Sequence, residues 1–101
     1  MIESKEKKIQ KVKKGTYDLI KGEFSPADAS EIVNDLFLKK INFHEVKSFS
    51  QLIRFDTNDP DTLQRISELK LSQKRAQELI AIAKKAGKSL RINSTVFIEL
   101  I

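Results

Sequence analysis

The stretch DPDTLQRISELKLSQKRAQELIAIAKKAG, residues 59–87, decides the architecture of this chain. Its first two residues suit a helix N-cap and the first helical position, and no Gly or Pro follows before Gly87. The sequence therefore predicts one long helix near residues 60–86, stopped by a left-handed Gly87. A break near residues 71–72 stays open, because Ser72 suits the cap of a new helix. One face of the helix is marked by alternating steps of three and four residues at Ile66, Leu69, Gln73, Ala76, Ile80 and Ala83.

After this helix, from Ser89, the hydrophobic period changes to two. Alternation of apolar and polar residues is typical of a half-buried strand, so we expect a strand over residues 89–101. The apolar residues that we expect the helices to cover are Leu90, Ile92, Val96 and Ile98.

Upstream of the long helix, Ser25-Pro26-Ala27-Asp28 is a second helix start with a cap and a capping box. The apolar spacing that follows predicts a helix from about Pro26 to Lys40. Asn42 and Glu45 could form another capping box, which would begin a short helix with Phe43, Val46 and Phe49 on its inner face. Residues 50–56 either continue that helix or lie extended on the core.

Residues 16–24 have strand character, and this first strand could start as early as Ile9. The predicted fold is α+β in β-α-α-α-β order. We expect the terminal strands to pair in a small sheet, covered on one face by two or three helices, because two strands alone are marginally stable. A chain of 101 residues suits one domain of this kind, over residues 15–101.

Residues 1–14 are expected to form a basic, flexible segment. They hold six lysines against two glutamates, a net charge of +4, whereas the whole chain carries +5. The rest of the chain is therefore nearly neutral, and the basic pI comes mostly from this segment. The segment lacks the apolar core of a signal peptide, and no apolar run reaches the roughly 20 residues that span a bilayer. We expect a cytoplasmic protein of bacterial type with no membrane partner.

The sequence offers no catalytic, cofactor-binding or metal-binding motif. It has no cysteine and one histidine, His44, which lacks companions for a zinc site and is expected at the surface or its boundary. The acids at 56, 59 and 61 resemble a calcium loop only briefly, because Pro60 interrupts them and the central Gly is missing. We predict that they form a loop and a helix N-terminus. We expect no cofactor, no metal and no enzymatic activity, with an unrecognised active site as the alternative.

The phenylalanines at 37, 43, 49 and 55 are spaced by six, which is not the spacing of one helical face. We expect each to reach a shared core from a different element. The alternative is an apolar groove that binds a peptide or a small ligand.

These features favour a small non-catalytic interaction or accessory protein, with a protein partner or self-association as a homodimer, that binds through a strand edge or a helix face. The alternative is a nucleic-acid-associated protein, because lysine-rich segments bind phosphates without reading sequence. Its contact residues would lie in the N-terminal arm and at the basic end of the long helix: Lys7, Lys8, Lys11, Lys13, Lys14, Lys74, Arg75, Lys84, Lys85 and Lys88.

Overall fold

The computed structural model describes residues 13–57 and 59–101. Its elements, in chain order, are β1 (Lys14–Phe24), α2 (Pro26–Phe55), α3 (Pro60–Ala86) and β2 (Leu90–Glu99). The α+β class, the pairing of the terminal strands and the long helix at 60–86 are thereby confirmed. The chain divides into two compact units. We call residues 13–23 with Arg91–Ile101 the ribbon, and Phe24–Leu90 the helical hairpin.

The expected order with three helices is wrong, because the order is β-α-α-β. No new helix begins at Asn42, and α2 continues through residues 50–55. A capping residue acts only where the chain leaves the helix, and no Gly or Pro between Pro26 and Pro60 forces it to leave. Each added helical residue gains one backbone hydrogen bond, so a single long helix forms. For the same reason α3 runs past residues 71–72 without a break.

Local side chains fix the ends of both helices. Ser25 caps α2 by accepting a hydrogen bond from the Asp28 N–H, and Asp59 caps α3 by accepting one from the Asp61 N–H. The left-handed conformation ends each helix, at Asp56 with φ 51° and at Gly87 with φ 66°. The predicted caps at Ser25 and Asp59 and the predicted stop at Gly87 are confirmed.

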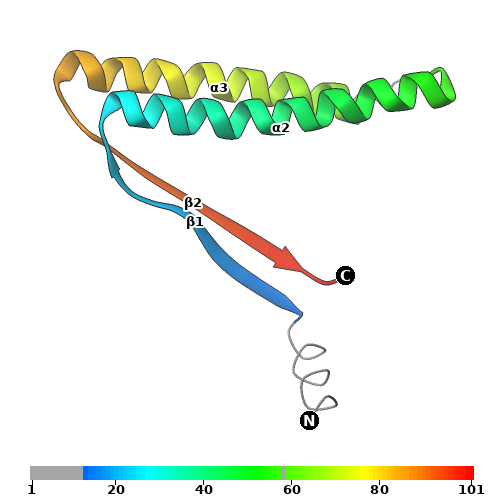
Figure 1. Ribbon diagram of the computed structural model, residues 1–101, viewed down its shortest axis with the longest axis horizontal. Coiled ribbons are helices and arrows are strands. Elements are labelled where there is room, and N and C mark those ends of the chain that lie inside the picture. The colour runs from blue at the N-terminus through cyan, green and yellow to red at the C-terminus, as the bar shows by residue number, and fades with distance from the viewer. Residues whose placement is uncertain (1–12, 58) are drawn as a thin grey trace, which may run out of the picture. The chain divides into compact units, whose positions relative to one another are not determined.

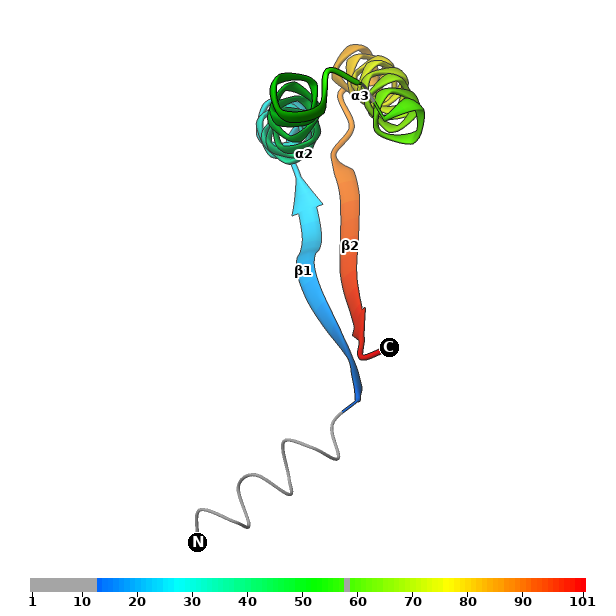
Figure 2. The ribbon, with the colours of Figure 1, turned by 90° about the vertical axis from the view of Figure 1, so that its right-hand side faces the viewer.

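The hairpin is held by one seam between two antiparallel helices that lie side by side (Figures 1 and 2). On α3 the seam confirms the predicted face and extends it to Thr62. On α2 the inward residues also alternate in steps of four and three, the spacing of coiled-coil packing. The buried or half-buried residues that follow these steps are Ser30, Asn34, Phe37, Ile41, His44, Ser48 and Gln51 on α2, and Thr62, Ile66, Leu69, Gln73, Ala76, Ile80 and Ala83 on α3. The buried Ala29 and the half-buried Val33 and Gln77 lie beside them.

Polar and apolar residues share the α2 side of the seam. Ile41, Ile66 and Leu69 form the buried cluster, with Phe37 packed against it. Towards the start of α2 the apolar contacts give way to a hydrogen-bonded ladder. The Asn34 Oδ1 atom accepts from Gln73 Nε2 at 3.1 Å and from Gln77 Nε2 at 3.0 Å. The Gln77 Oε1 atom accepts from the hydroxyl of Ser30 at 2.9 Å. The hairpin therefore encloses a small apolar core beside a polar network.

The ribbon consists of β1 and β2 paired edge to edge (Figure 2). The Leu100 N–H donates to the Lys13 carbonyl at 2.6 Å, and Arg91 pairs with Glu23 at 2.9 Å across the strands. The apolar face expected to be covered is only half-buried at Leu90 and Ile92, and it is exposed at Val96 and Ile98. No side chain of either strand is buried. Within residues 13–57 and 59–101, neither helix combines the length and apolar character needed to cross a bilayer.

Replacing a buried seam residue should cost far more stability than replacing an exposed one of the same type. Ile66 is 8% exposed and Ile82, in the same helix, is 63% exposed. We expect Ile66→Ala to lower the free energy of unfolding by about 2–4 kcal/mol, because it removes buried hydrocarbon and leaves a cavity. Ile82→Ala should change it by no more than about 0.5 kcal/mol. Urea titration followed by circular dichroism at one protein concentration measures both, and equal losses would contradict the seam.

The polar ladder should respond differently to one substitution and to two. Asn34→Leu leaves the amide group of Gln73 without its acceptor, at a cost of about 1–3 kcal/mol, whereas the Gln77 amide keeps the Ser30 carbonyl as an acceptor. The double variant N34L/Q73L removes the unpaired Gln73 amide as well and leaves Gln77 bonded to Ser30, so we expect it to recover at least the lost stability. Urea titration of the wild-type chain and the two variants checks this. A double variant no more stable than the single variant would show that the unpaired Gln73 amide is not the source of the loss.

Candidate interaction surface

Within residues 13–57 and 59–101, no three His, Asp or Glu side chains are placed to hold a metal ion. His44 is half-buried in the seam, which agrees with a boundary position. Its ring meets that of Phe43 edge to face at 5.4 Å, and its Nε2 atom is buried without a hydrogen-bond partner in the structure. The histidine therefore packs between the helices.

The acids after α2 serve the helix ends. Besides capping α3 through its backbone, Asp59 accepts a hydrogen bond from the hydroxyl of Thr62 at 2.9 Å. Asp56 is the left-handed residue that ends α2, and its N–H donates to the Leu52 carbonyl at 2.9 Å. The predicted loop and helix N-terminus are confirmed, and both carboxylate oxygens of Asp59 accept hydrogen bonds from the first turn of α3.

A shallow hollow lies at the end of the hairpin where α2 begins and α3 ends. Its lining includes Ser25, Ser30, Gln77, Lys84 and Lys88. The hydroxyl of Ser25 already caps α2, and Ser30 and Gln77 bond to each other. The polar groups of this hollow are therefore largely paired within the hairpin, and the two lysines supply its charge.

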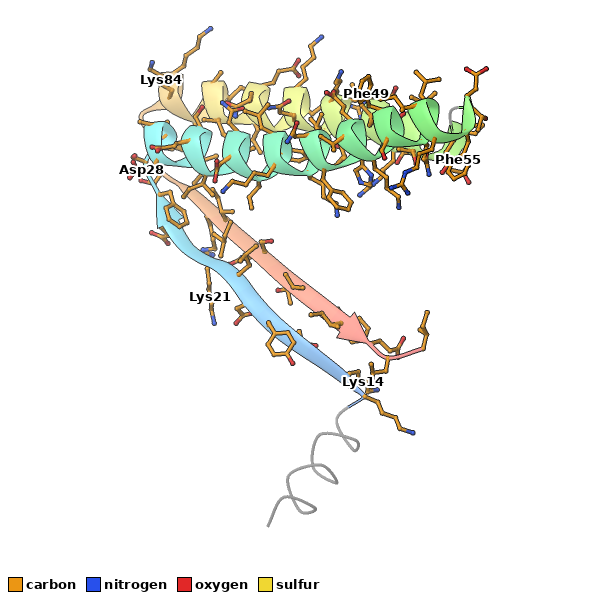
Figure 3. All side chains as sticks on the ribbon, turned by 45° about the vertical axis from the view of Figure 1, so that its right-hand side comes forward. Lys14, Lys21, Asp28, Phe49, Phe55 and Lys84 are labelled. Carbon is orange, nitrogen blue, oxygen red and sulfur yellow. The ribbon has the colours of Figure 1, made fainter. Side chains whose placement is uncertain are left out.

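The expectation that the four spaced phenylalanines reach a shared core from different elements is wrong, because all four lie on α2. Phe37 packs against the buried cluster, but Phe43, Phe49 and Phe55 are each more than half exposed. They lie on the half of α2 that leads into the loop, far along the helix from Asp28 (Figure 3). We call the exposed apolar side chains of this half the distal patch; they are Phe43, Val46, Phe49, Leu52, Ile53 and Phe55, each between 40% and 68% exposed.

The centre of the distal patch faces away from α3. Residues along an α-helix are about 100° apart, so Val46 lies about 160° around the helix from the buried Ser48. Ile53 lies at the same angle from Gln51, and Phe49 lies about 100° from Ser48. Asn42, Val46, Phe49 and Ile53 follow steps of four, three and four. The helix therefore carries a second heptad stripe, on the side opposite the seam.

Cationic side chains border the patch. A hollow along α2 is lined by Phe43, Val46 and Phe55 together with Lys39, Lys47 and Arg54. The Lys40 Nζ atom lies 5.4 Å from the centroid of the Phe43 ring, within the range of a cation–π contact. An apolar, aromatic centre with charged residues at the rim is the anatomy of a protein–protein interface.

The residues predicted to contact nucleic acid fall into three groups. Lys7, Lys8 and Lys11 lie outside the described residues. Lys13 and Lys14 are exposed at the start of β1, in the ribbon. The other five are exposed in the hairpin, on α3 and just after it, and within the described part of the chain they make no ion pair: Lys74, Arg75, Lys84, Lys85 and Lys88.

Sequence reasoning missed the distal patch because it assigned part of it to the inner face of a separate short helix. The signal was present in the steps from Asn42 to Ile53, which alternate like those of the long helix. Either of the two stripes on α2 could pack against α3, and the sequence of α2 alone does not show which of them α3 covers. Compared with known proteins, the chain matches no family model, no curated protein and no solved structure.

Proposed function

We propose that this chain is a small non-catalytic interaction protein and that the distal patch of α2 is its binding surface. The observation that carries the proposal is that more large apolar side chains of the hairpin are exposed than buried. Six apolar side chains are buried there, the largest of them Ile and Leu. Twelve large apolar side chains of the same hairpin are exposed, and half of these form the distal patch. Exposed apolar surface gathered in one place marks an interaction site.

The residue types of the patch also support binding. Phenylalanine brings a large apolar area with little loss of side-chain entropy, and aromatic residues are enriched at interface centres. The patch consists of hydrocarbon side chains, which exclude water and bind, but which carry no group that transfers a proton or attacks a bond. Lys39, Lys47 and Arg54 at the rim would add electrostatic selectivity for the partner.

The distal patch predicts which variant loses its partner. In Phe49→Glu a charge replaces a side chain that is 64% exposed, so the hairpin should keep its fold and lose binding. We expect chemical cross-linking in cells to capture a partner with a tagged wild-type chain and at least tenfold less with the variant. Leu79→Glu, at a 60% exposed position on α3, is the matched control and should retain the partner. Equal capture by the wild-type chain and Phe49→Glu contradicts the proposed surface.

The alternative function, association with nucleic acid, is favoured by the unpaired cations of α3. Lys74 and Lys85 lie about 20° apart around the helix, and Lys84 lies about 80° from Lys74, so these three share one side of α3 with a single acid, Glu78, about 40° from Lys74. A row of this kind can follow a phosphate backbone through release of counterions. Arg75 lies about 100° from Lys74, so it does not complete the row.

Binding to duplex DNA at several salt concentrations tests this alternative. The slope of log K for DNA binding against log salt concentration is negative. In K74A/K84A/K85A it should become shallower by about 2–3, because each lost phosphate contact removes about 0.9. The variant K39A/K40A/K47A removes the same charge from α2 and should keep the wild-type slope. A wild-type chain whose binding does not depend on salt would rule out the alternative.

A further inference from the structure

We propose that the partner that occupies the distal patch is a second copy of this chain, and that the two α2 helices pair antiparallel along their outer heptad stripes. This inference rests on the proposed function and names its partner. The stripe runs from Lys39 through Asn42, Val46 and Phe49 to Ile53, in steps of three, four, three and four, and Asp56, the left-handed residue that ends α2, follows three residues later.

The area of the patch matches what a dimer needs. Phe55 lies about 20° around the helix from the buried Ser48, on the seam side, so the pairing face uses the other five side chains of the patch. A whole phenylalanine presents about 200 Å², so these five, at 40–67% exposure, offer on the order of 500 Å². The smaller interfaces of standard size take about 600 Å² from each partner, which the five side chains reach when the polar rim is added.

Antiparallel pairing places apolar residues against apolar residues in the centre. In antiparallel coiled coils the two kinds of core position face each other, so Val46 of one copy meets Phe49 of the other, and the twofold axis repeats the contact. The next layer on each side pairs Ile53 with Asn42. The interface is self-complementary, as a closed dimer requires.

The charges at the ends of the stripe select the antiparallel direction. The same alignment brings Lys39 of one copy to Asp56 of the other, once at each end. Parallel pairing would instead place Lys39 beside Lys39 and Asp56 beside Asp56, which is unfavourable. Lys39 now makes only an exposed pair with Asp35 in its own helix, at 2.9 Å, and such a pair is weak enough to exchange.

Sedimentation tests the pairing in the full chain. We expect the wild-type chain to be a dimer at about 100 µM, within the micromolar range common for interfaces of this size. F49E/I53E should be monomeric at the same concentration with unchanged helical circular dichroism. Leu79→Glu should remain a dimer. A monomeric wild-type chain overturns the self-pairing, as does a dimeric F49E/I53E variant.

Cysteine cross-linking tests the direction, because the natural chain has no cysteine. Mixed K39C and D56C chains should form disulfide-linked heterodimers under mild oxidation, and neither variant alone should form linked dimers. Linked dimers from K39C alone overturn the antiparallel direction.

The tagged capture experiment separates this inference from the proposed function. Capture of a different protein, lost in Phe49→Glu, would leave the proposed function standing and overturn self-pairing. Equal capture by Phe49→Glu, together with a monomeric wild-type chain, would overturn both.

Discussion

The packing of α2 against α3 is the interaction on which the hairpin depends. Every buried side chain of the described residues lies on one of these two helices, and none lies on a strand. A hairpin of long helices gains its stability from the stripe that each helix buries, since isolated helices are marginally stable in water. The seam therefore decides both the stability of this protein and which side chains remain outside.

The seam on α2 carries polar residues beside the buried Ala29 and Ile41. The Asn34 Oδ1 atom accepts hydrogen bonds from Gln73 and from Gln77, and pairing of this kind is the condition under which polar groups are tolerated away from water. Such a ladder fixes the alignment of the two helices, because a shift by one turn would leave its donors and acceptors unpaired. The cost is a small core. The large apolar side chains that α2 does not bury lie outside, and they form the distal patch.

The local parts of the fold could be predicted from sequence, and the orientation of α2 could not. Ser25, Asp59 and Gly87 act through residues within one turn of themselves, so their roles as caps and stop could be read directly. Asn42 has the same chemistry as a cap but lies where nothing interrupts the helix. Phe37 and Phe49 look equivalent in sequence, yet one packs on the cluster and the other is exposed, because only one of them lies on the stripe that faces α3.

The sequence by itself determined the α+β class, the paired terminal strands, the long helix at 60–86 and the inner face of that helix. These follow from periodicity, capping chemistry and the absence of Gly and Pro, which all act over a few residues. The tertiary structure decided which of two stripes on α2 became the seam, and hence where the exposed phenylalanines lie. Either stripe of α2 could have packed against α3. The outcome depends on residues of α3 that are distant in sequence and that form hydrogen bonds with Asn34 and Ser30.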